Sequence, residues 1–174
     1  FMTPDRAPEY SVLAAWNWGN GLVYLARRPV VANNFLGWPE NAAANLLPYR
    51  FFVSESVDEA EAILDRHKVR YVIVSEPVAA GDFAMMLDSL EIPRSRYFTR
   101  RSEGQFEART RILKTMALRL YFLDGNKLEH FRLVFSSDEQ VKAGDRFTSK
   151  TKIFLYERGT AARDTPPAAP SLPL

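Results

Sequence analysis

The 174-residue sequence contains no cysteine, so disulfide bonds, thiol nucleophiles and cysteine-bound zinc are excluded. It has only two histidines, His67 and His130, and no His-Glu pair stands at the spacing of a zinc site. A Gly-rich phosphate loop, a Gly-x-Ser-x-Gly turn and an EF-hand loop are also missing. The residues alone therefore show no catalytic constellation, which disfavours a self-sufficient enzyme.

The sequence also lacks a strong net charge and any long apolar run. Lysine and arginine total 23 against 21 acidic residues, and the net charge of +2 gives no reason to expect a nucleic-acid partner. No apolar run approaches the roughly 20 residues that a membrane-spanning helix needs, and the start of the chain shows no secretory signal. A hydrophobic fraction of 47% with 25% charged residues is typical of a globular domain.

Composition divides the chain into three parts. Residues 1–9 carry Pro4 and Pro8 and are predicted to form an extended lead-in. Residues 10–159 alternate apolar segments with turn residues and are predicted to form a single core domain. In residues 160–174 proline and alanine recur without periodicity, which predicts a disordered or extended tail.

Hydrophobic periodicity within the core predicts a mixed α/β (α+β) domain, with a central sheet flanked by helices. Val69 to Val74 is apolar on both faces and is predicted to be a central strand. Ser56 and Glu59 form a capping box, so a helix is expected to start there and to end near His67. Further strands are expected at 12–15, 30–32, 130–135 and 150–156, and further helices at 19–28, 41–47, 82–90 and 109–120.

Two basic regions each allow a structural and a functional interpretation. The helix at 19–28 is expected to bury Leu22, Val23 and Leu25–Ala26. Arg27–Arg28 at its end fits either the helix dipole or an anionic phosphate. A second region comprises the basic loop at 97–104, with Arg94 and Arg96 beside it, and the helix at 109–120. It is either a solvated surface or a patch attracted to anionic lipid head groups or a lipid-linked pyrophosphate. The acidic residues at 58–61, Glu61 among them, are expected to be solvated.

The stretch 10–35 holds the most unusual chemistry. Trp16 and Trp18 flank Asn17 and precede Gly19, directly after an apolar strand. A strand that enters a Gly-punctuated turn places its last side chains in a loop, where indole rings offer rigid contact faces, each with one hydrogen-bond donor. We therefore predict a recognition loop here. The alternative is that the two rings close one edge of the core.

This stretch resembles the catalytic subunits of asparagine-linked oligosaccharyltransferases. Those proteins carry a W-W-D-Y-G signature at a strand end, then a short helix, one or two basic residues, and a strand ending in Asp or Asn before an aromatic. The sequence gives Ala15-Trp16-Asn17-Trp18-Gly19, then Leu22 to Arg28, then Pro29 to Phe35. The resemblance follows the order of elements over residues 10–160 and is specific in the first third. Ala, Asn and Trp replace the first Trp, the Asp and the Tyr of the signature.

The resemblance implies that the loop holds an acceptor polypeptide. Trp16, Asn17 and Trp18 would surround the acceptor's Ser or Thr, and Gly19 would allow a close backbone approach. In this family a second motif follows the central strand and lines the same pocket, either as Asp with Lys three residues on or as Met with Ile three residues on. Asp82 matches the first form, and Met85 stands where the Lys would be.

The resemblance also implies how the whole protein works. A multi-spanning membrane region would precede this chain and would bind the lipid-linked oligosaccharide and a divalent metal, Mn or Mg. This domain would need no cofactor of its own and would lie beside the membrane on the extracytoplasmic (periplasmic) side. By itself it is expected to be inactive.

Two alternatives remain from other classes of protein. The first is a non-catalytic carbohydrate- or peptide-binding module of an envelope protein, whose aromatic loop stacks on a sugar. The second is a purely structural interaction domain. Many spanning helices before Phe1 would favour the transferase.

Overall fold

The structure is a computed structural model that describes residues 8–33, 43–101, 105–137, 142–143, 146–147 and 150–158. The lead-in before residue 8 and the tail from residue 160 lie outside these ranges, so the predictions for them stay predictions.

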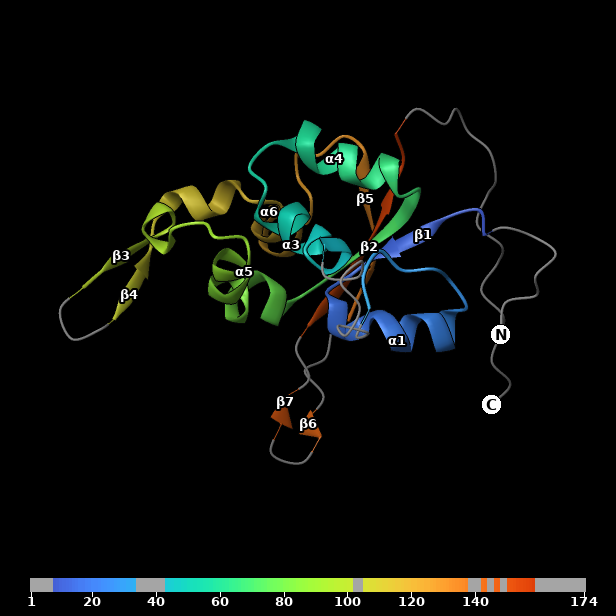
Figure 1. Cartoon of the computed structure of the whole chain (residues 1–174), viewed down its shortest axis with the longest axis horizontal. Helices are drawn as coiled ribbons and strands as arrows, with labels where there is room; N and C mark the ends of the chain where they lie inside the picture. The colour runs from blue at the N-terminus through green and yellow to red at the C-terminus, as the bar shows by residue number, and fades with distance from the viewer. Residues whose placement is uncertain are drawn as a thin grey trace.

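A four-stranded mixed sheet lies at the centre of the domain (Figure 1). Its order is β1 (Ser11–Leu13), β2 (Val69–Ser75), β8 (Thr151–Tyr156) and β5 (Phe131–Ser136). β1 and β2 are parallel, whereas β8 is antiparallel to both of its neighbours. Val30 adds a parallel bridge to Val12 on β1. The predicted mixed α/β fold and the internal position of β2 are confirmed, but the strand predicted at 30–32 is only this bridge.

One face of the sheet carries the main core. It is covered by α3 (Leu47–Val53), α4 (Val57–Arg66), α5 (Phe83–Ser89) and α6 (Met116–Leu123). Phe51 and Phe52 from α3 are fully buried with Phe154 from β8. At the start of α4 the Ser56 hydroxyl oxygen accepts the backbone N–H of Glu59 at 3.3 Å, which confirms the predicted cap.

The opposite face carries a smaller apolar cluster. The turn η1 (Trp16–Trp18) leads into α1 (Gly19–Gly21) and the π-helical segment η2 (Leu22–Ala26), which run below β1 in Figure 1. Only Leu22 of η2 packs on the cluster, so the predicted burial of Val23 and Leu25–Ala26 is wrong. The i→i+5 winding of a π-helix moves these side chains off the single face that an α-helical repeat predicts.

Two other helices differ from the prediction. The single helix expected at 109–120 is divided into η6 (Thr110–Lys114) and α6 by extended backbone at Thr115. The backbone N–H of Met116 donates to the Ser54 carbonyl at 2.9 Å, so a contact between distant segments sets the start of α6. Helix α3 was not predicted, because Pro48 indicated the end of a helix although it occupies the first turn of one. The helix predicted at 41–47 starts outside the described residues.

The remaining elements are short. They are η3 (Pro77–Gly81), η4 (Arg94–Arg96), the hairpin β3 (Phe98–Arg100) with β4 (Phe106–Ala108), and the pair β6 (Lys142–Ala143) with β7 (Arg146–Phe147). The β3–β4 hairpin occupies the region where the sequence predicted a basic loop.

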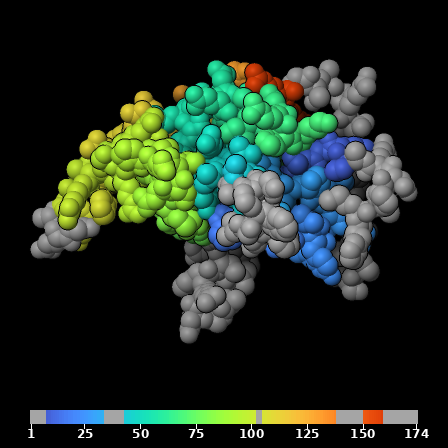
Figure 2. Space-filling view, in the orientation of Figure 1, coloured from blue at the N-terminus to red at the C-terminus, as the bar shows by residue number. Residues whose placement is uncertain are grey.

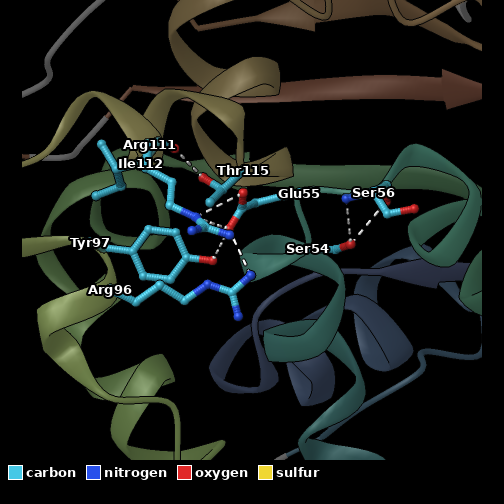
Figure 3. Close-up of polar contacts among 8 residues, drawn as sticks. All are labelled: Ser54, Glu55, Ser56, Arg96, Tyr97, Arg111, Ile112 and Thr115. Carbon is cyan, nitrogen blue, oxygen red and sulfur yellow. Dashed lines mark hydrogen bonds and ion pairs between the residues drawn. The ribbon is translucent and has the colours of Figure 1, made fainter.

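Glu55, in the turn between α3 and α4, joins three segments through one carboxylate (Figure 3). It accepts hydrogen bonds from the Tyr97 hydroxyl at 2.8 Å, from Arg96 at 3.0 Å and from Arg111 Nε at 2.8 Å. Burial acts to raise the pKa of Glu55, but the bonds from Arg111 and Tyr97 outweigh it and lower that pKa. Burial and the bond to Glu55 raise the pKa of Tyr97 to about 12.

Other arginines of the second basic region are also paired. Arg94 pairs with Asp88, and Arg101 lies 2.6 Å from Glu107. This pairing neutralises much of the charge that the sequence concentrates there, which favours the interpretation as a solvated surface.

Glu61 is not solvated, contrary to the prediction. Its side chain is 3% exposed, and its Oε1 lies 2.8 Å from His130 Nδ1. Arg158 lies 3.4 Å from its Oε2, and the Tyr156 hydroxyl donates to Asp65 one turn later at 2.8 Å. A charge inside a protein persists only when it is paired, so this network fixes α4 against β5 and β8.

Candidate functional site

The carboxyl ends of β1 and β2 define the candidate site. The two strands are parallel, so the segments that follow them leave the sheet at the same edge. One of these segments is η1, and the other is η3, which leads into Asp82 at the start of α5. In open α/β sheets this edge is the usual place for ligand contacts. The topology thus brings together two motifs that lie far apart in the sequence.

Tyr49 of α3 lies between the two motifs. The half-buried indole of Trp16 donates its N–H to the Tyr49 hydroxyl oxygen at 2.5 Å. Tyr49 is itself buried, and this burial, with a smaller contribution from the Asp82 charge, raises the pKa of its hydroxyl against the opposing effect of the Trp16 bond. The phenol therefore contacts Trp16 and experiences the field of Asp82.

Asn17 and Trp18 form the open part of the loop. Asn17 is exposed, and 40% of the Trp18 surface is accessible to solvent. The Trp18 backbone N–H donates to the Ala15 carbonyl at 3.0 Å, which closes the turn. The alternative that both rings merely close the core therefore fails for Trp18, while Trp16 packs against the main core.

Gly19 packs closely against the backbone of residues 32–33. A Cβ atom at this position would lie 2.4 Å from the Ala32 carbonyl oxygen and 2.5 Å from the Asn33 Cα. The close backbone approach that glycine allows is therefore made by the protein's own segment at residues 32–33.

Asn45 lies behind this segment. Its side-chain oxygen accepts the Asn33 backbone N–H at 3.1 Å. Its buried side-chain nitrogen has no hydrogen-bond partner among the residues that the structure describes. A buried donor without a partner costs about 1–3 kcal/mol, so within the described ranges the Asn45 amide carries an unmet hydrogen bond.

The two residues of the second motif differ in their surroundings. Asp82 is half-buried at the start of α5, and its side chain does not cap the helix. Met85, one turn on, is 44% exposed, while its neighbours Met86 and Leu87 are buried. Within the described ranges Asp82 affects Tyr49 only through its charge, and Met85 has no such effect.

Tyr49 is the site residue that sequence reasoning missed. Its spacing to Phe52 and Val53 on α3 is that of an ordinary core position. No sequence pattern around Tyr49 indicates a contact with Trp16, because the two residues are 33 positions apart.

The arrangement presents aromatic and polar side chains that can contact a ligand. In the described part of the chain, no group of three or more His, Asp or Glu side chains is placed to hold a metal ion. The same residues include no helix that is long and apolar enough to cross a bilayer. What the edge offers is an exposed indole, an exposed amide and a half-buried carboxylate.

Sequence comparison points to one family. The family model described as the AglB core domain matches residues 2–79. Two dolichyl-phosphooligosaccharide-protein glycotransferases of Archaeoglobus fulgidus, numbers 1 and 2, are each 31% identical over 134 residues, covering 77% of this chain and 22% of the relative. The chain thus spans about a fifth of the length of the curated relatives it matches.

Solved structures agree with the sequence comparison. The C-terminal globular domain of an A. fulgidus oligosaccharyltransferase is similar with a TM-score of 0.63 at 26% identity, over 90% of this chain and 86% of that domain. A second such domain gives 0.57 at 29% identity, over 86% and 81%. An A. fulgidus oligosaccharyltransferase tethered to an acceptor peptide with the NVT sequon shares the fold, with a TM-score of 0.58 at 23% identity over 79% of this chain and 19% of that protein. The chain therefore belongs to the AglB family of oligosaccharyltransferases, in which it corresponds to the C-terminal globular domain.

Proposed function

We propose that this domain recognises the acceptor peptide for a membrane oligosaccharyltransferase that transfers a lipid-linked glycan to protein. The observation that carries the proposal is the bond from Trp16 to Tyr49 beside the exposed Asn17 and Trp18, at the sheet edge where η1 and η3 both leave the sheet. The A. fulgidus relative tethered to an NVT peptide supports it, because it shares this fold.

The residues of the loop have different roles in this proposal. The Trp16 indole has a single N–H donor, and this donor is bonded to Tyr49. Trp16 therefore positions the loop, and the neighbouring Asn17 and Trp18 contact the peptide. The Trp18 ring supplies an apolar face, and the Asn17 amide oxygen accepts the hydroxyl hydrogen of the acceptor's Ser or Thr. A neutral amide forms about half as strong a bond as a carboxylate would.

Catalysis in this proposal comes from positioning. Binding energy gained at the loop orients the acceptor nitrogen toward the reacting glycan. The divalent metal, Mn or Mg, and the lipid-linked donor would be bound by the rest of the longer protein. The domain would lie beside the membrane on the extracytoplasmic side, as the resemblance implies.

The test is glycan transfer by the longer protein that contains this chain. With a lipid-linked oligosaccharide as donor and a labelled Asn-X-Thr peptide as acceptor, we expect Trp18→Ala to raise the acceptor KM by about tenfold or more, because central aromatic contacts carry most of the energy at an interface. Phe122→Ala is the matched control, since Phe122 is an exposed aromatic on α6. An unchanged KM for Trp18→Ala would refute the proposal.

Asn17→Asp tests the hydrogen bond to the acceptor's hydroxyl. A carboxylate would strengthen that bond, so the kcat/KM ratio between Asn-X-Thr and Asn-X-Ala peptides should rise. The sugar-binding alternative predicts a different result, namely that soluble glycan alone quenches Trp18 fluorescence and peptide does not.

A further inference from the structure

Segment η2 presents unusually exposed apolar side chains. Tyr24 is 82% and Leu25 80% exposed, well above the 56% of the next most exposed large apolar residues in the described part of the chain. Leu22 is the η2 side chain that packs on the apolar cluster of the sheet, and packing within the described part of the chain does not bury Tyr24 and Leu25. Exposed apolar groups gathered in one place mark an interaction surface.

Cations gather at the end of this segment. Arg27 follows η2, and the Arg28 guanidinium carbon lies 4.6 Å from the Tyr10 ring centroid. Arg70 lies on the same ring at 5.4 Å, and Lys68 is exposed two residues earlier. None of the four cations forms an ion pair within the described ranges, unlike the arginines around Glu55. Their charge is therefore free to act on a partner.

The path of the chain places these groups on one side of the molecule. Because Val30 is parallel to Val12, η2 runs back alongside β1 and its end returns to the beginning of the strand (Figure 1). Arg28 thus meets Arg70 at the start of β2. Figure 2 shows the blue surface of this segment protruding at the lower right. We call Tyr24, Leu25, Arg27, Arg28, Lys68 and Arg70 the η2 surface.

We propose that the η2 surface binds the headgroup region of an anionic lipid bilayer. Tyrosine and leucine on one helical segment bury their side chains at the boundary between headgroups and acyl chains, and flanking arginines contact the lipid phosphates. The excess of unpaired positive charge around an apolar centre complements a negatively charged bilayer, and it does not complement a neutral one. This surface lies at the end of η2 away from the Trp18 loop, so the proposal does not depend on peptide recognition.

The experiment is vesicle binding by the 174-residue chain. Co-sedimentation with large unilamellar vesicles is compared for phosphatidylcholine alone and for phosphatidylcholine with phosphatidylglycerol at a 3:1 ratio. Each cation near an anionic surface raises the binding constant about fivefold, so binding should require phosphatidylglycerol and weaken with added salt. The variants are Tyr24→Ser/Leu25→Ser and Arg27→Glu. The matched controls are Phe122→Ser/Leu123→Ser, an exposed apolar pair elsewhere, and Arg100→Glu, an exposed arginine elsewhere.

We expect the Tyr24/Leu25 variant to bind anionic vesicles at least tenfold more weakly, and Arg27→Glu at least fivefold more weakly. Both controls should bind as the unaltered chain does, and circular dichroism should show that all variants are folded. Absence of binding to anionic vesicles would overturn the proposal and would point to a protein surface as the partner of η2. Equal binding to both kinds of vesicle, or an equal loss in the controls, would also overturn it.

Discussion

Gly19 and Gly21 provide a test in which the same substitution should have opposite effects. Both residues have helical backbone angles, with φ and ψ of −53° and −50° at Gly19 and −60° and −43° at Gly21. Alanine in place of a helical glycine normally stabilises a protein by about 0.5–1 kcal/mol, because the unfolded chain loses conformational freedom. The two positions therefore differ only in what a new methyl group would meet.

The surroundings of the two glycines are sharply different. At Gly21 no atom lies within 4 Å of the place that a new methyl group would take, so Gly21→Ala should gain the full 0.5–1 kcal/mol or so. At Gly19 the methyl would stand 2.4 Å from the Ala32 carbonyl oxygen and 2.5 Å from the Asn33 Cα, about 1 Å closer than ordinary van der Waals contact. Both obstacles are backbone atoms, which cannot rotate away. We expect Gly19→Ala to lose about 1–3 kcal/mol, as overpacking does in cores.

Urea unfolding, followed by circular dichroism and tryptophan fluorescence, measures the difference. The two variants should differ by about 1.5–4 kcal/mol in the free energy of unfolding at an unchanged m-value, which corresponds to about 3–16 °C in melting temperature for a domain of this size. If Gly19→Ala is as stable as Gly21→Ala, the contact between the Trp loop and residues 32–33 does not exist in solution and the reasoning fails.

Three further predictions concern the core and the Glu55 network. Phe52→Ala should lower the free energy of unfolding by about 3–5 kcal/mol, because Phe52 is fully buried. Urea titration measures this loss, and a loss below about 1 kcal/mol would contradict the packing. Glu55→Gln should cost about 1–2 kcal/mol at neutral pH. The folded pKa of Glu55 is lowered, so this difference should be complete above pH 4.5 and vanish as the pH falls through the folded pKa; a pH-independent difference would argue against the network. Tyr97 should ionise with a pKa of about 12, measured as the absorbance at 295 nm that Tyr97→Phe removes. Its raised folded pKa stabilises the protein below pH 10, an effect lost between pH 10 and about pH 12, and ionisation at pH 10 would refute the buried hydrogen bond.

Signals contained within one segment predicted their elements correctly. The two-sided apolar run of β2 and the Ser56–Glu59 capping box depend only on neighbouring residues. Contacts with distant segments therefore do not alter the elements that these patterns predict. The alternation at 150–156 likewise predicted β8, with Phe154 and Tyr156 on the main core and Ile153 on the opposite face.

Features decided by contacts between distant segments escaped prediction. The break at Thr115 accompanies the bond from Met116 to the Ser54 carbonyl, and Tyr49 joins the site through a partner on another element. Glu61 has the pattern of a surface charge on its own helix, and its burial depends on the approach of His130, which lies 2.8 Å from its carboxylate. The sequence located the loop of the candidate site, but it could not identify what holds the loop in place.

The helical path from η1 through α1 to η2 is continuous over residues 16–26. Tyr24 and Leu25 are therefore joined to Trp18 by a stiff backbone connection of about 10 Å, at a rise of about 1.5 Å per residue. A change in the inclination of η2 displaces the loop with it. A contact that fixes the inclination of η2 would thereby also fix the position of the Trp18 loop relative to the sheet.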